Sequence, residues 1–431
     1  MFKIINLTLL LIVYTALCCY GADEKNNDIE FKSLNDKVYA LTVYDGMLIV
    51  GGEFDSAGGK LVNMIASWDG NGWNPLGTGV DGYRVNALCV YDNKLISGGW
   101  FTGAGGVSAA YIAAWDGGSW SAVGDEAVST VEALSVFDGQ LYAGSVFFFP
   151  NTDNIAIWNG SAWDSLGSSI EGDVNALCVF NNKLIVGGEF DSAGGIPASN
   201  IAAWNGSSWS LLSTGVGEYY VKALCVYDGR LIAGGYFSEA GSITANNIAA
   251  WDGISWSNLG TGMNGFVYAL AEYNGKLYAG GLMTMAGGEW AHSVAVWDGE
   301  SWSALGDDDL SDGVFSLCVF DNQLIAGGEF TYQNGDTIDY IGAWDGFTWS
   351  AMESQVPCCI GVTGNINCSA SENPDISDIT RIIDFLYLSH LPLCCPEEAD
   401  INGSGGDPDI SDVTKLIDYL YLSGAPVAPC P

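Results

Sequence analysis

Residues 38–52 read VYALTVYDGMLIVGG and residues 65–76 read IASWDGNGWNPL, and these two stretches decide the fold. Their signature, Trp-[Asp/Asn]-Gly-x-x-Trp, occurs seven times at intervals of 43 to 47 residues and accounts for fourteen of the sixteen tryptophans. The pairs are Trp68/Trp73, Trp115/Trp120, Trp158/Trp163, Trp204/Trp209, Trp251/Trp256, Trp297/Trp302 and Trp344/Trp349. Repetition at this period is typical of propeller blades or solenoid units.

Each repeat contains four short segments with the character of β-strands. The first, such as Val38 to Tyr44, is rich in β-branched and aromatic residues, and a turn such as Asp45-Gly46 leads to a second segment that ends in Gly-Gly. Ile-Ala-x-Trp follows after a longer loop, and the second tryptophan opens the fourth segment. Seven such units predict an all-β protein, a seven-bladed β-propeller with four-stranded blades.

The acidic or amide residue after each first tryptophan has a structural explanation. It precedes glycine in a tight turn, where an Asx side chain accepts hydrogen bonds from the backbone that follows it. These residues are Asp69, Asp116, Asn159, Asn205, Asp252, Asp298 and Asp345. We therefore assign them to the turns and not to catalysis.

The glycine pair that closes the second strand and the tryptophan of the fourth strand resemble kelch-type propellers over residues 38–352. The tandem Trp-Asp-Gly-x-x-Trp is not the usual kelch sequence motif. The resemblance accordingly implies the propeller fold and leaves the function open.

Charge and composition exclude several functions. Thirteen Lys and Arg stand against 51 Asp and Glu, a net charge of −38, which repels nucleic acids and anionic membranes. The propeller contains one histidine, His292, whereas the copper-oxidase chemistry known among kelch propellers needs two, and a serine-hydrolase triad would depend on His292 alone. We predict no catalytic residue.

The first 21 residues have the pattern of a signal peptide, with Lys3, an apolar run from Ile4 to Leu17 and small residues before Ala22. This run is shorter than the roughly 20 residues of a spanning helix, so we expect no membrane span and a secreted or cell-surface protein. Residues 22–37 form an N-terminal segment ahead of the propeller.

The cysteines fall into two groups. Four occupy the same position in separate repeats, which predicts free thiols: Cys89, Cys178, Cys225 and Cys318. Six lie within the last 74 residues, as in small exported domains held by disulfides. Their pairing cannot be read from the sequence.

The loops indicate where a ligand binds. The second-to-third strand loops and the inter-blade loops are long and should emerge on one face, where the second residue of each first strand, which varies between repeats, should ring the mouth of the central channel. These candidate ligand-binding residues are Tyr39, Asn86, Glu132, Asn175, Lys222, Tyr268 and Phe315. Their mixture of aromatic, amide and charged side chains suits a polysaccharide or a protein.

A duplication follows a linker at residues 353–360. Asn365-Ile366-Asn367 leads to a segment from Asp375 to Leu386, and Asp400-Ile401-Asn402 leads to its copy from Asp409 to Leu420. Alternating oxygen side chains before an amphipathic helix are what an EF-hand-type calcium loop requires. Residues 361–424 resemble a type I dockerin, which implies two calcium-loop and helix repeats within a domain spanning 361–431.

This resemblance implies calcium as a cofactor and a cohesin-like partner. The implied ligands are Asp400, Asn402, Ser404, Asp409 and Asp412 in the second loop, and Asn365, Asn367, Ser369, Asp375 and Asp378 in the first. The residues at the cohesin-contact positions are Ile376, Ser377, Ile410 and Ser411. Both loops are longer than the usual twelve residues, which weakens calcium binding.

Two functional hypotheses follow. The first is an exported, non-enzymatic protein whose propeller recognises a polysaccharide or a protein and whose tail docks to a cohesin-like partner or a cell surface. The alternative is a dockerin-borne glycoside hydrolase or lyase with a carboxylate site on the propeller face, for which carboxylates are plentiful.

Overall fold

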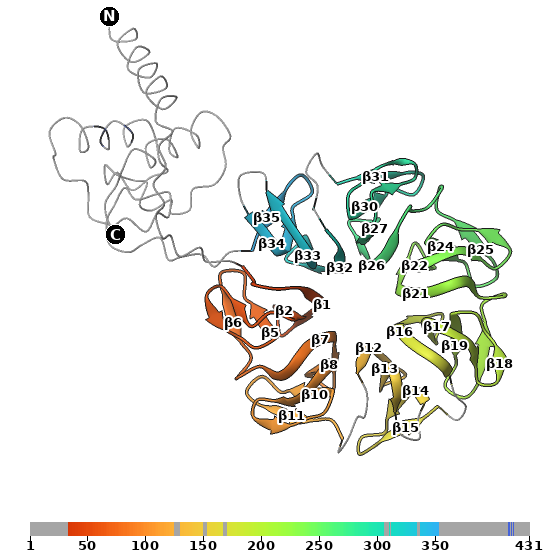
Figure 1. The fold of residues 1–431 in the computed structure, drawn as a ribbon, viewed down its shortest axis with the longest axis horizontal. Coiled ribbons are helices and arrows are strands. Elements are labelled where there is room, and N and C mark those ends of the chain that lie inside the picture. Colours follow the sequence, from red (N-terminus) through yellow and green to blue (C-terminus); the bar gives the residue numbers. More distant parts are fainter. Residues whose placement is uncertain are drawn as a thin grey trace, which may run out of the picture. The chain divides into compact units, whose positions relative to one another are not determined.

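The computed structural model describes residues 33–352, except 125–129, 150–152, 167–169, 306–309, 311 and 334–336, together with Val413, Lys415 and Ile417. The predicted signal peptide, most of the N-terminal segment and the linker lie outside the described residues. In the described part the chain forms seven antiparallel sheets, each built on a path of four strands, so the predicted all-β, seven-bladed propeller is confirmed (Figure 1). No helix within that part is long and apolar enough to cross a membrane.

The four strands of each blade follow one another from the axis of the ring to its edge. The innermost strands are β1 (Val38–Tyr44), β7 (Val80–Tyr91), β12 (Val131–Phe137), β16 (Ile170–Phe180), β21 (Val216–Tyr227), β26 (Phe266–Tyr273) and β32 (Val314–Phe320). The second strands are β2 (Met47–Gly52), β8 (Lys94–Ala104), β13 (Gln140–Phe149), β17 (Lys183–Ala193), β22 (Arg230–Ala240), β27 (Lys276–Leu282) and β33 (Gln323–Gln333).

The outer half of each blade is shorter. The third strands are β5 (Ile65–Trp68), β10 (Ile112–Trp115), β14 (Asp153–Trp158), β19 (Ile201–Trp204), β24 (Ile248–Trp251), β30 (Val294–Trp297) and β34 (Thr337–Trp344). The outermost are β6 (Trp73–Pro75), β11 (Trp120–Ala122), β15 (Trp163–Ser165), β20 (Trp209–Leu211), β25 (Trp256–Asn258), β31 (Trp302–Ala304) and β35 (Trp349–Ala351). Two-residue strands in the second-to-third loops are β3 (Ser56–Ala57), β4 (Lys60–Leu61), β9 (Val107–Ser108), β18 (Ile196–Pro197), β23 (Ile243–Thr244), β28 (Met285–Ala286) and β29 (Glu289–Trp290).

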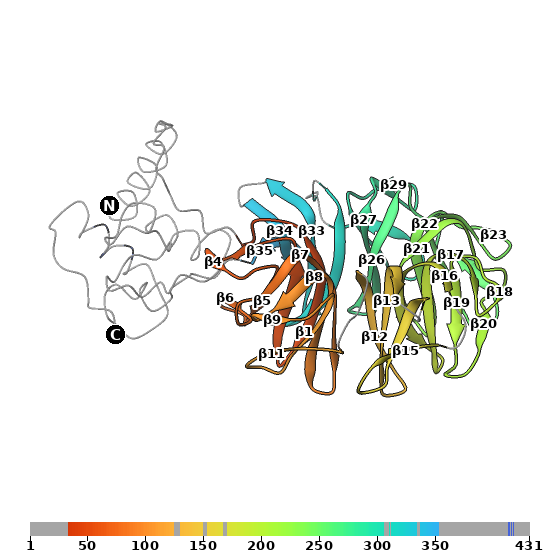
Figure 2. The same ribbon diagram turned by 60° about the horizontal axis from the view of Figure 1, so that its bottom comes forward.

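Antiparallel order gives the ring two different faces. The tight first-to-second and third-to-fourth hairpins lie on one face, here called the turn face, as the β12–β13 hairpin does at the lower edge of Figure 2. The second-to-third and inter-blade connections lie on the other, the loop face, where β29 is found. Several second strands continue past the glycine pair towards the loop face, so the predicted strand end at Gly-Gly is wrong for β8, β17, β22 and β33.

The first glycine of each pair makes room for the neighbouring blade. A Cβ on Gly51 would lie 2.5 Å from Cγ1 of Val85, the first valine of the next blade, and a Cβ on Gly187 would lie 2.6 Å from Val221. The same relation holds at all seven junctions, including the last, where Gly327 meets Val38. Glycine at this position therefore allows the blades to pack closely.

The second glycine makes room for a β-bulge. A Cβ on Gly188 would overlap the carbonyl oxygen of Asp173, the residue before the constant valine, and Gly52 stands in the same relation to Lys37. At this point the pairing of every innermost strand skips one residue, as between Val38 and Ala40. The third blade has Ser145 at this position, fully buried, and keeps the bulge.

The tryptophan pairs connect neighbouring blades at the edge of the ring. Within each pair the ring centroids lie 5.1 to 5.5 Å apart. The second indole donates to a backbone carbonyl of the preceding blade, as Trp120 Nε1 does to Leu76 O at 2.8 Å and Trp256 Nε1 to Leu212 O at 3.1 Å. Trp209 Nε1 is buried without a hydrogen-bond partner among the described residues, beside a pocket of about 360 Å³ lined in part by Leu166.

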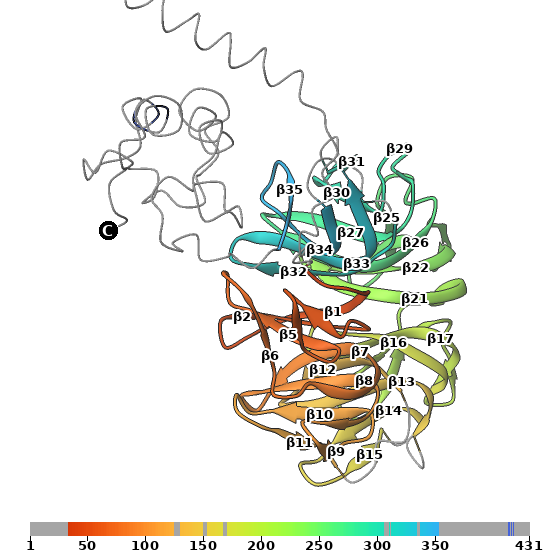
Figure 3. The same cartoon turned by 60° about the vertical axis from the view of Figure 1, so that its left-hand side comes forward.

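The ring closes without exchanging a strand between the first and last blades, each of which is one contiguous segment (Figure 3). Instead, Leu48 and Val50 share a buried cluster with Ile325 and Ile341. Trp73 Nε1 donates to Met352 O at 2.9 Å across this junction. Hydrophobic burial and the same indole bond that joins other blades therefore hold the closure.

The four repeat-position cysteines are free thiols, as predicted. They pack at the edges of the inter-blade clusters, and burial raises the pKa of Cys89 to about 12 and that of Cys178 to about 11. These thiols are consequently protonated and unreactive near neutral pH.

Candidate functional site

The seven variable residues of the innermost strands are the residues at the bulges. Because a bulge turns its extra residue out of the ladder, their side chains point towards the axis of the ring and not into the inter-blade core. Contacts join them into one network near the loop face. We call this set the mouth ring: Tyr39, Asn86, Glu132, Asn175, Lys222, Tyr268 and Phe315.

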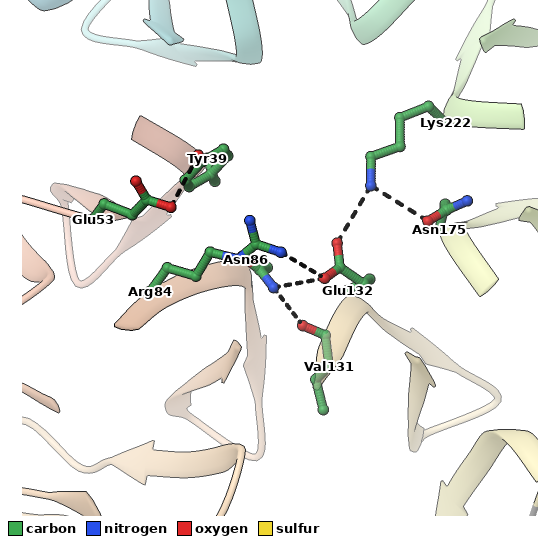
Figure 4. A network of polar contacts seen from close by, with 8 residues as sticks. All are labelled: Tyr39, Glu53, Arg84, Asn86, Val131, Glu132, Asn175 and Lys222. Carbon is green, nitrogen blue, oxygen red and sulfur yellow. Dashed lines mark hydrogen bonds and ion pairs between the residues drawn. The ribbon is translucent and has the colours of Figure 1, made fainter. Parts of the chain in front are cut away.

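One part of the mouth ring is organised around Glu132, whose side chain is only 9% exposed. Its carboxylate accepts from Asn86 Nδ2 at 2.8 Å, from Arg84 at 3.4 Å and from Lys222 Nζ at 3.3 Å (Figure 4). Lys222 also donates to Asn175 Oδ1 at 3.4 Å. We call these five residues the ionic half; in it one carboxylate lies between two cations.

The other part consists of stacked aromatic rings. Tyr39 and Phe315 are parallel with centroids 5.3 Å apart, and Tyr268 meets Phe315 edge-on at 5.5 Å. Phe266 stacks on Tyr268 at 5.8 Å, and Tyr220 stacks on Phe266 at 6.4 Å. These five residues, the aromatic half, form a continuous arc from the fifth blade through the sixth and seventh to the first.

Arg84 joins the two halves. Its guanidinium reaches Glu132 and lies over the ring of Tyr39, 5.3 Å from the centroid, a cation–π contact. Arg84, Tyr220 and Phe266 were not predicted. Each precedes the constant valine, and in a regular strand, where side chains alternate between two faces, that position would not lie beside the bulged residue. Variation at that position was the available signal.

Two further aromatic pairs stand beside the mouth ring and were also missed; Tyr83, Trp100 and Tyr219 are exposed and Tyr236 is half-buried. Tyr83 and Trp100, on β7 and β8, have ring centroids 4.6 Å apart. Tyr219 and Tyr236, on β21 and β22, are 4.4 Å apart and nearly parallel. We call these pairs the two aromatic platforms.

Carboxylates surround the mouth ring. Glu53 accepts from the Tyr39 hydroxyl at 3.2 Å, and Glu329 pairs with Lys37 at 2.5 Å, which raises the pKa of Lys37. Asp173 lies opposite Glu189 across β16 and β17. Burial, and then the charge of Glu189, raise the pKa of the Asp173 carboxyl.

The mouth tyrosines stay protonated. Burial raises the pKa of Tyr39, Tyr220 and Tyr268, with Glu53 adding to the effect at Tyr39. At neutral pH their hydroxyls are thus neutral groups that donate or accept hydrogen bonds.

The remaining candidates for chemistry are structural. In all seven Asx turns the side-chain oxygen accepts two backbone N–H groups, as Asp69 Oδ1 does from Asn71 and Gly72 at 2.9 and 2.8 Å, which confirms their predicted role. His292 stacks on Trp290. Over residues 33–352, gaps excepted, no cluster of three or more His, Cys, Asp or Glu side chains is placed to hold a metal ion.

The predicted calcium and cohesin residues lie outside the described residues. These are Asn365, Asn367, Ser369, Asp375, Asp378, Asp400, Asn402, Ser404, Asp409 and Asp412, with Ile376, Ser377, Ile410 and Ser411. Just after the second loop, Val413, Lys415 and Ile417 are helical.

No family model and no curated protein matches the chain. Among solved structures it is similar to the WD40 β-propeller domain of Doa1, with 16% identity, a TM-score of 0.44 and coverage of 69% of this chain and 92% of that one. It is also similar to the computationally designed Ika8 protein, with 21% identity, a TM-score of 0.42 and coverage of 69% and 96%.

A third similar structure is the extracellular domain of a hybrid two-component system from B. thetaiotaomicron, with 11% identity and a TM-score of 0.48. The match covers 71% of this chain and 40% of that one. At these identities the similarity concerns the fold alone, and no function is taken from it.

Proposed function

We propose that this chain is an exported, non-enzymatic binding protein whose propeller binds a glycan at the mouth ring. The observation that carries the proposal is the joining of an aromatic arc to a set of amide and charged groups on one face. A sugar ring has an apolar C–H surface and a rim of hydroxyls. Sites for such ligands combine aromatic walls with a few placed polar groups.

The ionic half supports binding and not catalysis. Three donors occupy the Glu132 carboxylate, and it is the neutralising partner of Arg84 and Lys222. A carboxylate engaged by three donors in this way holds its neighbours in place and has few free lone pairs for a ligand. The amides of Asn86 and Asn175 supply both donors and acceptors for hydroxyls.

One observation favours the enzymatic alternative. Asp173, whose pKa is raised, lies opposite Glu189, and glycoside hydrolases work with two carboxyl groups of which one is protonated. A reducing-end assay of the full chain on plant and microbial polysaccharides tests this alternative. Turnover that disappears in Asp173→Asn would establish the enzyme and overturn the non-enzymatic proposal; no turnover on any substrate is the expected result.

The binding test uses the full mature chain on arrays of immobilised glycans. We expect at least one glycan to bind and Tyr268→Ala to weaken it by at least about tenfold, since an aromatic stack is worth about 1 to 3 kcal/mol. Phe347→Ala is the matched control because Phe347 is 84% exposed on the turn face. A blank array, or equal binding after Tyr268→Ala in a chain that melts normally, would contradict the proposal.

We also propose that the C-terminal residues dock this binding protein to a cohesin-like partner or a cell surface. The duplicated segments, the dockerin resemblance and the six cysteines in the last 74 residues support this proposal, as does the leader for export. Asp400, Asn402, Ser404, Asp409 and Asp412 would hold calcium in the second loop, and every one of them offers a side-chain oxygen, which this cation prefers.

Calorimetric titration of the full chain with calcium chloride tests the docking proposal. We expect a binding heat that is lost in Asp409→Ala/Asp412→Ala, and calcium-dependent retention on beads carrying cohesin modules that EGTA abolishes. Equal calcium binding by the variant, or retention that EGTA leaves unchanged, would contradict it.

A further inference from the structure

We infer that the mouth holds an extended, uncharged polysaccharide chain that rests on both aromatic platforms at once. This inference depends on the proposed glycan-binding function and adds the length and the charge of the ligand. Three observations support it: the placement of the platforms, their exposure and the charge around them.

The platforms occupy equivalent places in two blades. Tyr83 and Tyr219 each lie two residues before the constant valine, and Trp100 and Tyr236 each follow the glycine pair. At these two positions the first and seventh repeats have Asp and Glu, and the third has Ser and Val. The fourth repeat has Gly and Glu, and the sixth has Gly and Leu. Aromatic residues at both positions are thus a property of the second and fifth blades alone.

Both platforms present rings to solvent. Tyr83 is 67% exposed, Trp100 47% and Tyr219 51%, whereas Tyr236 and the aromatic half of the mouth ring are half-buried. Within each platform one ring supports the other. Two supported, exposed aromatic surfaces are suited to stacking on the flat face of a sugar ring.

The platforms stand on opposite sides of the ring axis. Figure 1 places β7 and β8 across the ring axis from β21 and β22. At twelve residues each, β7 and β21 are the longest innermost strands. A ligand that touches both platforms must cross the mouth, which requires a chain of several sugars.

The charges around the mouth favour an uncharged chain. Four exposed carboxylates lie on the strands that extend towards the loop face: Asp81, Glu171, Glu218 and Glu239. The cations Lys37, Arg84 and Lys222 are each paired with Glu329 or Glu132. An anionic polysaccharide would therefore meet repulsion, and these three cations are already neutralised by protein carboxylates.

The test measures the affinity of the full chain for cello-, laminari- and manno-oligosaccharides from the disaccharide to the octasaccharide, with oligogalacturonates as the anionic counterpart. We expect one neutral series to bind, its longest members at least about a hundredfold tighter than its disaccharide, as two linked contacts require. Oligogalacturonates should bind more weakly than neutral chains of equal length.

Two single variants and their combination separate the platforms. Trp100→Ala and Tyr219→Ala should each lower the affinity for the longest chain by at least about tenfold and change that for the disaccharide by about twofold or less. Trp100→Ala/Tyr219→Ala should remove the length dependence, and Phe347→Ala should leave it unchanged. Melting curves verify that each variant folds.

The outcomes distinguish the inference from the proposed function. If the wild-type chain binds neither these series nor any glycan on the arrays, the proposed function fails. If it binds a glycan but long chains bind no tighter than short ones, or the double variant keeps the length dependence, the extended-chain inference is overturned. Tighter binding of oligogalacturonates would overturn its charge component.

Discussion

The two halves of the mouth draw their side chains from the same two backbone positions, the bulge and the residue before the constant valine, and differ completely in chemistry. In the ionic half, Glu132 lies among Arg84, Asn86 and Lys222, while in the aromatic half Tyr39, Phe315 and Tyr268 stack on one another. Both halves depend on the same constant valine, first glycine and bulge. The constant valine, glycine and bulge therefore fix where a side chain points and leave its identity free to vary.

The largest effect is expected from breaking the frame that both halves share. Gly187→Ala, in the blade that carries Asn175, and Gly280→Ala, in the blade that carries Tyr268, each place a Cβ 2.6 Å from a valine of the next blade. Each should lower the free energy of unfolding by about 3 kcal/mol in urea titrations. Gly118→Ala is the control, since the nearest atom to its Cβ is 3.8 Å away.

A second substitution tests the cause. Adding Val221→Ala to Gly187→Ala removes the atom that the new Cβ would meet, so the double variant should lose less stability than the sum of the single changes. If the two effects are simply additive, the valine contact is not the reason for glycine at this position.

The two halves should differ in how much stability a single polar group contributes. Glu132→Ala leaves Arg84 and Lys222 without their shared anion and should cost about 2 kcal/mol, between the values for exposed and buried ion pairs. Tyr268→Phe keeps the ring stack of the aromatic half and should cost less than about 1 kcal/mol. If urea titrations show that the two variants lose equal free energy of unfolding, the expected difference between the halves is contradicted.

The indole bonds at the edge of the ring allow a finer comparison. Trp256→Phe removes the hydrogen bond to Leu212 O, whereas Trp209→Phe removes an N–H that has no partner among the described residues. With similar loss of volume, Trp256→Phe should be more destabilising by about 1 kcal/mol, the usual worth of one hydrogen bond. Equal unfolding free energies would mean that the inter-blade bond adds nothing.

The smallest effect is the pH dependence of stability that arises from Asp173. Because burial and Glu189 raise the pKa of Asp173, the folded state holds this proton more tightly than the unfolded state. Stability from this group should therefore increase as pH falls from neutrality through the folded pKa towards the unfolded value near 4. The free energy of unfolding of the wild type, relative to that of Asp173→Asn, should therefore rise as the pH is lowered from 7 to 4. A difference that stays flat or falls would contradict the assignment.

Much of the fold could be predicted because it rests on local rules. The period of the tryptophan pairs gives the blades, and the Asx-Gly turns and the free thiols follow from single positions. The mouth residues could be identified because they vary where their neighbours do not. The bulge could not be seen, since it arises from a carbonyl meeting a glycine on another strand, as Asp173 meets Gly188.

The contacts across the axis were also beyond sequence reasoning. Nothing local indicates that Glu132 and Lys222, 90 residues apart, form an ion pair, or that Arg84 reaches both halves. Such contacts depend on where strands from distant repeats end in space. The second platform lies within one blade and needed the register shift between β21 and β22, which skips Tyr219 and pairs Tyr220 with Tyr236.

Hydrogen exchange of the full chain, with and without the tightest glycan from the arrays, tests the central claim most directly. If the mouth is the binding site, bound glycan should slow exchange in β21, β22 and β26, which carry Tyr219, Tyr236 and Tyr268, and leave the turn-face hairpins unchanged. Protection confined to the turn face, or bound glycan with no protection at the mouth, would contradict it.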